Sequence, residues 1–285
     1  MKIGFIGAGK MGFTLGKHFE GSPLVELVGY YSKSPQSAKE AALFTDTEYY
    51  EDIGNLVDKC DALFLTVPDD QIAVTAEMLD GLDVDLKGKI ICHTSGALSS
   101  QVFSDMQSHV YGYSIHPIYA VSSKTQSYEN FNKCFITIEG HEKYKQQLVE
   151  LFASLGHEVK VISPDDKVRY HSSAVMASNL VIGLYYMAQK ELMKCGFSYE
   201  ETGRALGALF EGNADRLLKT DVFTALTGPV ERCDRNTVNN HISVLDGDAL
   251  NVYKLLSKQL VEIAEVKNED RQQREEYSNL LNFLS

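Results

Sequence analysis

The sequence predicts an α/β protein with a doubly wound, mostly parallel sheet, followed by an all-α domain. Over the first 163 residues, short apolar runs typical of buried strands alternate with helical segments, which is the pattern of consecutive β-α-β units. A glycine-rich turn joins the first apolar run to the first helical segment. From residue 164 onward helical periodicity continues and no further strand is predicted. We therefore expect two domains, residues 1–163 and residues 164–285.

The first turn of the predicted sheet has an informative glycine spacing. Lys2–Ile6 is predicted as a buried strand that leads through a GxGxxG sequence into a helix over Phe13–Glu20. In this spacing the first glycine makes the tight turn, the second lets the backbone approach a pyrophosphate, and the third lets the helix pack closely on the sheet. The helix N-terminus offers unpaired N–H groups to the phosphates. A turn without a ligand is the alternative, but between a strand and a helix the motif favours a dinucleotide site. The cofactor-binding residues predicted in this turn are Gly7, Ala8, Gly9, Lys10, Met11 and Gly12.

The remaining elements of the first domain follow from apolar runs and turn residues. Asp69 or Asp70 can cap a helix that runs through Leu79. Residues 61–67 contain the continuous apolar run Ala-Leu-Phe-Leu, which indicates a strand covered on both faces. Strands are predicted at residues 24–31, 61–67, 89–93, 110–115, 134–139 and 158–162, and helices at residues 36–43, 51–59 and 142–155.

The domain boundary is predicted from a helix-start signal. Residues 163–166, Ser-Pro-Asp-Asp, combine a capping residue, a proline allowed at the first helical position and two acids. The helix that follows is predicted to continue to residue 194, a length of about 45 Å. Because this exceeds a small domain, we expect a second copy to cover part of it, so that the all-α domain makes a homodimer. Further helices are predicted at residues 199–218, 237–245, 249–266 and 270–284.

Composition excludes several classes of protein. The formal net charge of −12 argues against a nucleic-acid partner, whose phosphates require a basic face, and against binding to an anionic membrane surface. Residues 170–189 lack charged side chains, yet their His, Ser, Asn and Gln residues favour a buried helix over a membrane span. The first strand begins at residue 2, which leaves no room for a signal peptide. Five scattered cysteines without a CxxC pair indicate reduced thiols, and we expect a cytoplasmic protein.

The end of the second predicted strand indicates which cofactor binds. NAD-dependent enzymes usually place an acid about 20 residues after the glycines, where it binds the ribose 2′-hydroxyl. Here the chain has Ser32, Lys33 and Ser34, and the first acid is Glu40. Two hydroxyls and a lysine can receive a 2′-phosphate, whereas Lys33 could also be an ordinary solvated side chain. We favour NADP as the cofactor.

Polar residues at the ends of later strands mark the expected reaction centre, because ligands bind outside the carboxyl ends of parallel strands. Nicotinamide is expected against Val67 and Pro68 of one strand end and against Thr94 and Ser95 of another, with Ser95 and Gly96 toward the substrate. His93 and His116 also stand at strand ends, where a proton donor would be placed. Either imidazole could instead bond a neighbouring carbonyl.

The long helix supplies a second group of polar residues, His171, Ser172, Asn179 and Gln189. His171 and Asn179 are eight residues apart, about 12 Å along the axis, and share a broad face. Contact with a ligand and bonding to a neighbouring helix are both consistent with this pattern. A Gly-Pro turn at residues 227–234 is a third candidate, for which we favour a structural role; an ion pair between Arg232 and Asp234 could hold this turn. No metal-ligand spacing is present.

These residues together resemble the Rossmann-like oxidoreductases that carry a C-terminal helical domain of unassigned function. That family is related to pyrroline-5-carboxylate reductase, to the 6-phosphogluconate and β-hydroxyacid dehydrogenases, and to the deazaflavin-dependent NADP reductases. The resemblance implies an N-terminal NADP-binding domain, a helical dimerisation domain and a site in the cleft between them. It is carried by GFIGAGKMG at residues 4–12, VPDDQI at 67–72, HTSGALS at 93–99, SIHP at 114–117, YHSSAVMASN at 170–179 and ALTGPVERCD at 225–234.

At two positions this chain departs from the family pattern, and the resemblance therefore does not imply the family's residue roles there. The family places glycine where this chain has Cys233, and the β-hydroxyacid dehydrogenases have a catalytic lysine where this chain has Val175. The candidate catalytic residues are therefore His116, His171 and Asn179, and His116 and His171 are also expected near the substrate.

Three functions are compatible with the sequence. The first is an NADP-dependent oxidoreductase that transfers a hydride to or from a small carbonyl, imine or hydroxy acid. The second is a non-catalytic NADP-binding or redox-sensing protein. The third is a helical scaffold with a degenerate cofactor domain, against which the intact glycines of residues 7–12 argue.

Overall fold

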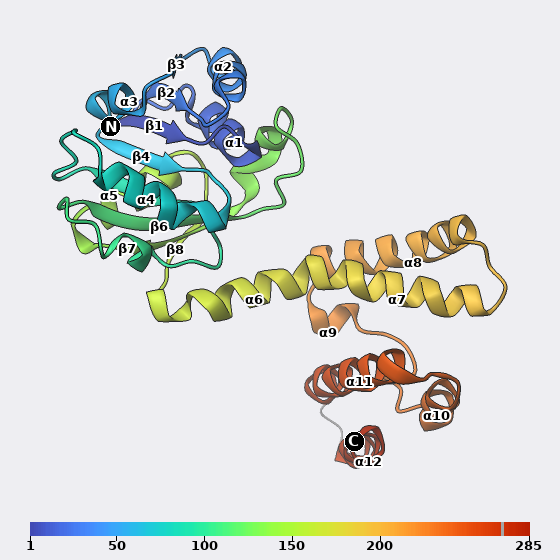
Figure 1. Ribbon diagram of the computed structural model, residues 1–285. Coiled ribbons are helices and arrows are strands. Elements are labelled where there is room, and N and C mark those ends of the chain that lie inside the picture. The colour runs from blue at the N-terminus through green and yellow to red at the C-terminus, as the bar shows by residue number, and fades with distance from the viewer. Residues whose placement is uncertain (269–270) are drawn as a thin grey trace. The chain divides into compact units, whose positions relative to one another are not determined.

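The computed structural model describes residues 1–268 and 271–285 and divides into two compact units, Met1–Ser178 and Asn179–Ser285 (Figure 1). The first unit is built on one eight-stranded sheet with the strand order β3-β2-β1-β4-β5-β6-β7-β8. All neighbouring strands pair in parallel except β6 and β7, which are antiparallel. The strands are β1 (Lys2–Ile6), β2 (Glu26–Tyr31), β3 (Glu48–Tyr50), β4 (Ala62–Leu65), β5 (Ile90–His93), β6 (Tyr111–Ile118), β7 (Phe135–Gly140) and β8 (Val159–Val161).

Helices cover both faces of this sheet, as a doubly wound fold requires. The side chains of β1 alternate between the two faces: Phe5 packs in one apolar cluster and Ile6 in the other. The cluster of Phe5 includes residues of α1, α2 and α5, whereas that of Ile6 includes residues of α3 and α4. The predicted fold class is therefore confirmed. The helices of this unit are α1 (Lys10–Phe19), α2 (Pro35–Phe44), α3 (Ile53–Lys59), α4 (Ile72–Asp80), α5 (Glu142–Ser154) and α6 (Lys167–Ala177), with the 3-10 turns η1 (Asp69–Gln71), η2 (Ser100–Phe103), η3 (Ser127–Lys133) and η4 (Pro164–Asp166).

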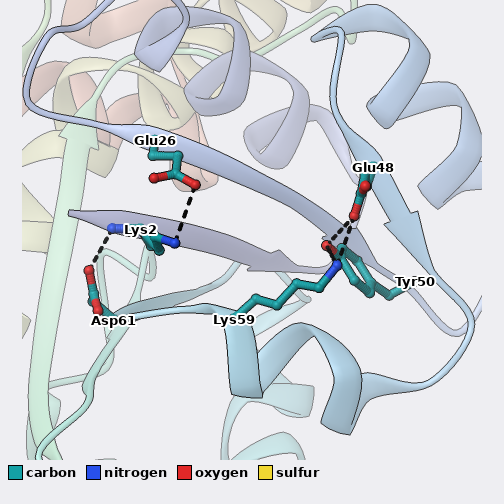
Figure 2. Close-up of polar contacts among 6 residues, drawn as sticks. All are labelled: Lys2, Glu26, Glu48, Tyr50, Lys59 and Asp61. Carbon is teal, nitrogen blue, oxygen red and sulfur yellow. Dashed lines mark hydrogen bonds and ion pairs between the residues drawn. The ribbon is translucent and has the colours of Figure 1, made fainter.

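Two separate groups of polar contacts lie near β1 to β4 (Figure 2). The backbone N–H of Lys2 donates to Asp61 at 2.8 Å, and the Lys2 ammonium lies 3.5 Å from Glu26. Tyr50 donates its hydroxyl hydrogen to Glu48, and Lys59 contacts both groups at 3.1 Å. The charged side chains of both groups are exposed, so their charges are well screened. The group of Lys2 lies where β1 and β2 begin, whereas Tyr50 ends β3 and pairs with Tyr31, the last residue of β2.

The second unit is helical throughout its described residues, which confirms the predicted all-α region. Its buried core joins α10, α11 and α12 with the segment after α9, through residues such as Leu226, Val238, Val261 and Tyr277. Across the described parts of the chain, none of the helices combines the length and apolar character needed to cross a bilayer. The helices are α7 (Asn179–Lys194), α8 (Tyr199–Lys219), α9 (Val222–Ala225), α10 (Arg235–Val244), α11 (Gly247–Lys267) and α12 (Arg271–Leu284).

The single helix predicted from residue 164 to residue 194 is wrong. The chain leaves helical geometry at Ser178, where φ is −125° and ψ is −84°, so α6 and α7 are separate helices. Periodicity does not reveal this break, because one non-helical residue hardly disturbs an apolar pattern. The division between the two units also falls after Ser178, so α6 belongs to the first unit. The predicted boundary after residue 163 lies before α6.

The Gly-Pro turn of the second unit is held differently from the prediction. Asp234 caps α10 by accepting hydrogen bonds from the backbone N–H and the hydroxyl of Thr237, at 3.0 and 2.7 Å. Within the described residues, Arg232 and Asp234 do not come within ion-pair distance of each other. Cys233 has a φ of 53°, a left-handed conformation that glycine adopts more readily. A cysteine at this position therefore strains the backbone of the turn.

Candidate functional site

The glycine turn between β1 and α1 has the geometry that its spacing predicts. Gly7 has a φ of 109°, and a Cβ there would lie 2.8 Å from the backbone of Thr66. At Gly12 a Cβ would lie 2.7 Å from the carbonyl oxygen of Gly7, so only glycine lets α1 approach this closely. Gly9 differs, since its Cβ would meet nothing closer than the Thr66 carbonyl oxygen at 3.8 Å. The protein itself thus requires glycine at positions 7 and 12 but leaves open space beside Gly9.

A cavity of about 510 Å³ opens at the carboxyl ends of β1, β2 and β4. Gly9 at its edge is the N-cap of α1 and supplies no side chain, so the N–H groups of the first turn are not capped by a side chain. Seven of the predicted cofactor-binding residues line this cavity, namely Gly7, Ala8, Gly9, Ser32, Lys33, Val67 and Pro68.

Several predicted cofactor residues do not line this cavity. Gly12 packs against Gly7, while Lys10 and Met11 form the first turn of α1. Ser34 caps α2 by accepting from the backbone N–H of Ser37 at 3.3 Å. Thr94 and Ser95, which were also predicted to contact the cofactor, likewise do not line this cavity.

The polar lining near β2 is basic, with no Asp or Glu among the residues that face the cavity. Lys33 donates to the side-chain oxygen of Gln71 at 3.1 Å. Lys124, from the segment between β6 and β7, lies 5.0 Å from the ring centre of Phe13 and 3.6 Å from Glu40. Sequence analysis missed Lys124, because nothing in its local sequence predicts that this segment reaches the cavity.

The turn after β5 is held by Ser95. Its hydroxyl donates to Asp69 at 2.7 Å and accepts from the backbone N–H groups of Ala97 and Leu98 at 3.1 and 3.0 Å. Ser95 is buried, whereas the preceding Thr94 is half-buried. These bonds fix the backbone of the turn that presents Gly96.

His93 has a structural role at the end of β5. Its Nδ1 accepts from the backbone N–H of Ser95, and its Nε2 lies 3.2 Å from the carbonyl oxygen of Ser99. The side chain is fully buried, and burial lowers its pKa to about 4. Of the two interpretations of His93, bonding to a neighbouring carbonyl is the one that the geometry supports.

The rings of His116 and His171, two of the candidate catalytic residues, lie beside Gly96. A Cβ at Gly96 would lie 2.8 Å from His116 Nε2 and 2.3 Å from His171 Nδ1. The two rings are nearly perpendicular, with centres 5.8 Å apart. His116 Nδ1 is bonded to the Tyr170 hydroxyl at 2.6 Å. Among the described residues, His171 Nδ1 is the buried side-chain atom that lacks a hydrogen-bond partner.

His116 does not have the pKa of an unperturbed imidazole, which is 6.5. Burial lowers its pKa to about 3, and the charges of Lys167 and His171 add to this effect. At pH 7 the imidazole is therefore neutral. It can donate one hydrogen bond, but it does not carry the extra proton of an imidazolium ion.

Lys167, which was not predicted, is a buried cation whose charge acts on His116. It begins α6, is 1% exposed, and donates to the Ser114 hydroxyl at 2.6 Å. Burial lowers the pKa of its ammonium to about 8, and the carboxylates of Glu139 and Asp69 oppose that shift. Its position in the sequence resembles that of any solvated lysine in a first helical turn, so no local signal identifies it. Asn179 belongs to the other unit, where it begins α7, and its catalytic role stays a prediction.

Two family models match the chain in succession. Residues 1–117 match a Rossmann-like domain, and residues 134–260 match a domain of unknown function, DUF2520. The chain thus combines a Rossmann-like domain with a DUF2520 domain. This confirms the resemblance that the sequence motifs indicated. Comparison with curated proteins gave no match.

Solved structures share this fold over nearly the whole chain. Protein TM1727 of Thermotoga maritima is 25% identical, with a TM-score of 0.73, and the match covers 93% of this chain and 99% of that one. The candidate NADP oxidoreductase BF3122 of Bacteroides fragilis is 24% identical, with a TM-score of 0.64 and coverage of 91% and 97%. The pyrroline carboxylate reductase of Plasmodium falciparum, solved with NADP bound, is 14% identical, with a TM-score of 0.55 and coverage of 100% and 98%.

Proposed function

We propose that this Rossmann-like, DUF2520-containing protein is an NADP-dependent oxidoreductase that acts on a small carbonyl, imine or hydroxy-acid substrate. The observation that carries the proposal is the cavity at the carboxyl ends of β1, β2 and β4, with the glycine turn on one side and Lys33 on the other. Structures with the same fold include an NADP-bound reductase and a candidate NADP oxidoreductase, which supports the cofactor class.

The residues around the cavity fit NADP. The space beside Gly9 can admit a pyrophosphate, and the uncapped first turn of α1 offers it N–H groups. Ser32, Lys33 and Lys124 would receive the 2′-phosphate, and no carboxylate of the lining would repel it. Val67 and Pro68 would support the cofactor beyond the pyrophosphate, toward the turn of Thr94 and Ser95.

When bound, NADPH supplies a hydride to the substrate carbon and is itself oxidised. The substrate oxygen or nitrogen then gains an electron pair and takes up one proton. The ring nitrogens of His116 and His171, which lie beside Gly96, would contact the substrate. The ammonium of Lys167 would supply positive charge near His116. Isothermal titration calorimetry with NADPH, followed by a screen of small carbonyls, imines and hydroxy acids, tests the proposal. Tight NADPH binding without turnover would favour the redox-sensing alternative.

The preference for NADP over NAD is tested at Lys33. A charge-assisted hydrogen bond contributes about 1.5–3 kcal/mol, so Lys33→Ala should weaken NADPH binding about 10-fold or more. NADH binding should hardly change, because NADH lacks the 2′-phosphate. Lys39→Ala is the matched control, since Lys39 is exposed on α2 and does not line the cavity. Equal affinities of the unaltered protein for the two cofactors would contradict the preference.

We also propose that the second unit forms a homodimer. Although α6 and α7 are separate helices, the second unit leaves large apolar side chains exposed to solvent, including Ile182 (70% exposed), Leu218 (86%) and Val244 (74%). Extended exposed apolar surface marks interaction sites. We expect an interface of at least ~1,600 Å² in total. Sedimentation at micromolar concentration checks this, and a monomer would contradict it.

Scattered cysteines without a disulfide pattern support a cytoplasmic location.

A further inference from the structure

Lys124 brings a positive charge to the cofactor cavity from a distant part of the chain. It lies in the segment between β6 and β7, yet it lines the cavity at the carboxyl ends of β1, β2 and β4. Its ammonium lies 5.0 Å from the ring centre of Phe13 in α1. The cavity of about 510 Å³ has room for a ligand beside Lys124, and the described residues that line it include no Asp or Glu. A phosphate group placed there would meet no repelling carboxylate in the lining.

Two contacts hold the backbone near Lys124 in place. The backbone N–H of Ser123 donates at 3.0 Å to the hydroxyl of Ser127, which is buried. The ring of Tyr128 lies edge-on to Phe44 of α2, with ring centres 5.7 Å apart. The segment is therefore fixed, whereas the side chain of a lysine is a flexible four-carbon stem that carries a point charge. The ammonium of Lys124 can change its partner without a movement of the backbone.

The ammonium of Lys124 is paired with a carboxylate that does not line the cavity. Glu40 of α2 lies 3.6 Å from it, and the other oxygen of Glu40 accepts from the side-chain amide of Gln36 at 3.1 Å. The side chains of the ion pair are 41% and 49% exposed, so water screens the pair and separating it costs little. A phosphate monoester carries about 1.5 to 2 negative charges at pH 7, against one on a carboxylate. The 2′-phosphate of NADP is therefore the stronger partner for Lys124.

Lys33, the other lysine of the lining, is paired differently. Its ammonium donates to the neutral side-chain oxygen of Gln71 at 3.1 Å. Over the described part of the chain, no carboxylate lies within ion-pair distance of Lys33. A phosphate thus reaches Lys33 by displacing a neutral group, but it reaches Lys124 by displacing Glu40. Of these two lysines, Lys124 is the one whose charge an acid can withhold from the cavity.

We infer that Glu40 and the 2′-phosphate of NADP compete for the ammonium of Lys124. Lys124 is then a residue that determines the preference for NADP over NAD, and Glu40 limits the affinity for NADP. The inference rests on the proposed function. Glu40 acts from outside the cavity lining, because it holds the lysine that the cofactor's 2′-phosphate requires.

Glu40→Gln tests this competition. Glutamine keeps the size of the side chain and removes its charge, so Lys124 becomes available to the cofactor. NADPH should bind about two- to fivefold more tightly, which is the range that exposed ion pairs contribute. NADH should bind as it does to the unaltered protein, because it lacks the 2′-phosphate. Isothermal titration calorimetry with each cofactor measures both affinities, and an unchanged NADPH affinity would overturn the inference.

Glu26→Gln is the matched control for the loss of a negative charge. Glu26 pairs with Lys2 at 3.5 Å, nearly the length of the pair between Glu40 and Lys124, and neither Glu26 nor Lys2 lines the cavity. The control variant therefore loses the same charge and a similar exposed ion pair, and its NADPH affinity should stay unchanged. A gain as large as that of Glu40→Gln would mean that net charge alone governs binding, which contradicts the competition.

Lys124→Met keeps an unbranched stem over Phe13 and removes the ammonium. NADPH should bind about 10-fold or more weakly, while NADH binding hardly changes. The double variant with Lys124→Met and Glu40→Gln should bind NADPH no more tightly than Lys124→Met alone, since Glu40 then has no lysine to withhold. A gain in the double variant equal to that of Glu40→Gln would show that Glu40 acts without Lys124. Equal losses of NADPH and NADH affinity in Lys124→Met would place the lysine at the pyrophosphate, and either result would overturn the inference.

The same titrations separate the inference from the proposed function. If the unaltered protein binds NADPH but the variants of Glu40 and Lys124 do not respond as stated, the inference fails and the oxidoreductase proposal stands. If the unaltered protein binds neither NADPH nor NADH, the proposed function and the inference are both contradicted.

Discussion

Gly9→Val should abolish measurable NADPH binding while the protein stays folded. In the structure a Cβ at Gly9 meets nothing closer than 3.8 Å, so the protein can accommodate the added side chain. The branched side chain would instead occupy the space beside the first turn of α1, where the pyrophosphate has to approach the backbone. We expect a loss of at least 100-fold in affinity by calorimetry, with an unchanged circular dichroism spectrum.

Position 9 allows this test, whereas its neighbouring glycines do not. At Gly7 and Gly12 a side chain would meet backbone at 2.8 and 2.7 Å, so loss of binding there could not be separated from damage to the fold. Gly81→Val is the matched control, because Gly81 follows α4, has ordinary contacts at 3.6 Å and lies outside the cavity. Normal NADPH affinity in Gly9→Val would remove the dinucleotide site from this turn.

The predictable parts of the fold are those that a short stretch of sequence determines by itself. Buried parallel strands and the glycine turn produce recognisable patterns in short stretches of sequence, so most strands of the sheet and the glycine turn between β1 and α1 were predicted. The three-residue strand β3 was missed because it is half-exposed and lacks an apolar run. The break at Ser178 was missed because helical periodicity resumes after one residue.

The candidate reaction site was predicted in part, since its chemistry depends on contacts between distant residues. His116 was a candidate because it stands at the end of a predicted strand. His171 was a candidate because it is a polar residue in a predicted helix without charged side chains. Nothing local distinguishes Lys167 from a surface lysine, because its burial results from packing against Ser114 on β6. The neutral state of His116 has the same origin, since it follows from burial and from the charge of Lys167.

His116→Ala should lower turnover about 100- to 1,000-fold, the usual effect of removing one hydrogen-bond donor to a developing oxyanion. NADPH affinity should stay within a few-fold, because His116 does not line the cofactor cavity. His109→Ala is the matched control, since His109 is an exposed histidine in the loop before β6 and should retain full activity. Steady-state kinetics with a substrate from the screen measure both variants. Full activity in His116→Ala would place the donor elsewhere.

The pH dependence of the same reaction separates the roles of His116 and Lys167. Because the pKa of His116 is lowered to about 3, reduction should show no inflection from this group between pH 5 and pH 7. The pKa of Lys167 is lowered to about 8, so raising the pH through 8 removes its positive charge and should slow the reduction. Lys167→Met should lower the rate near neutral pH and abolish the decline above pH 8. If that variant keeps the decline, the ammonium of Lys167 does not stabilise the charge that develops on the substrate oxygen.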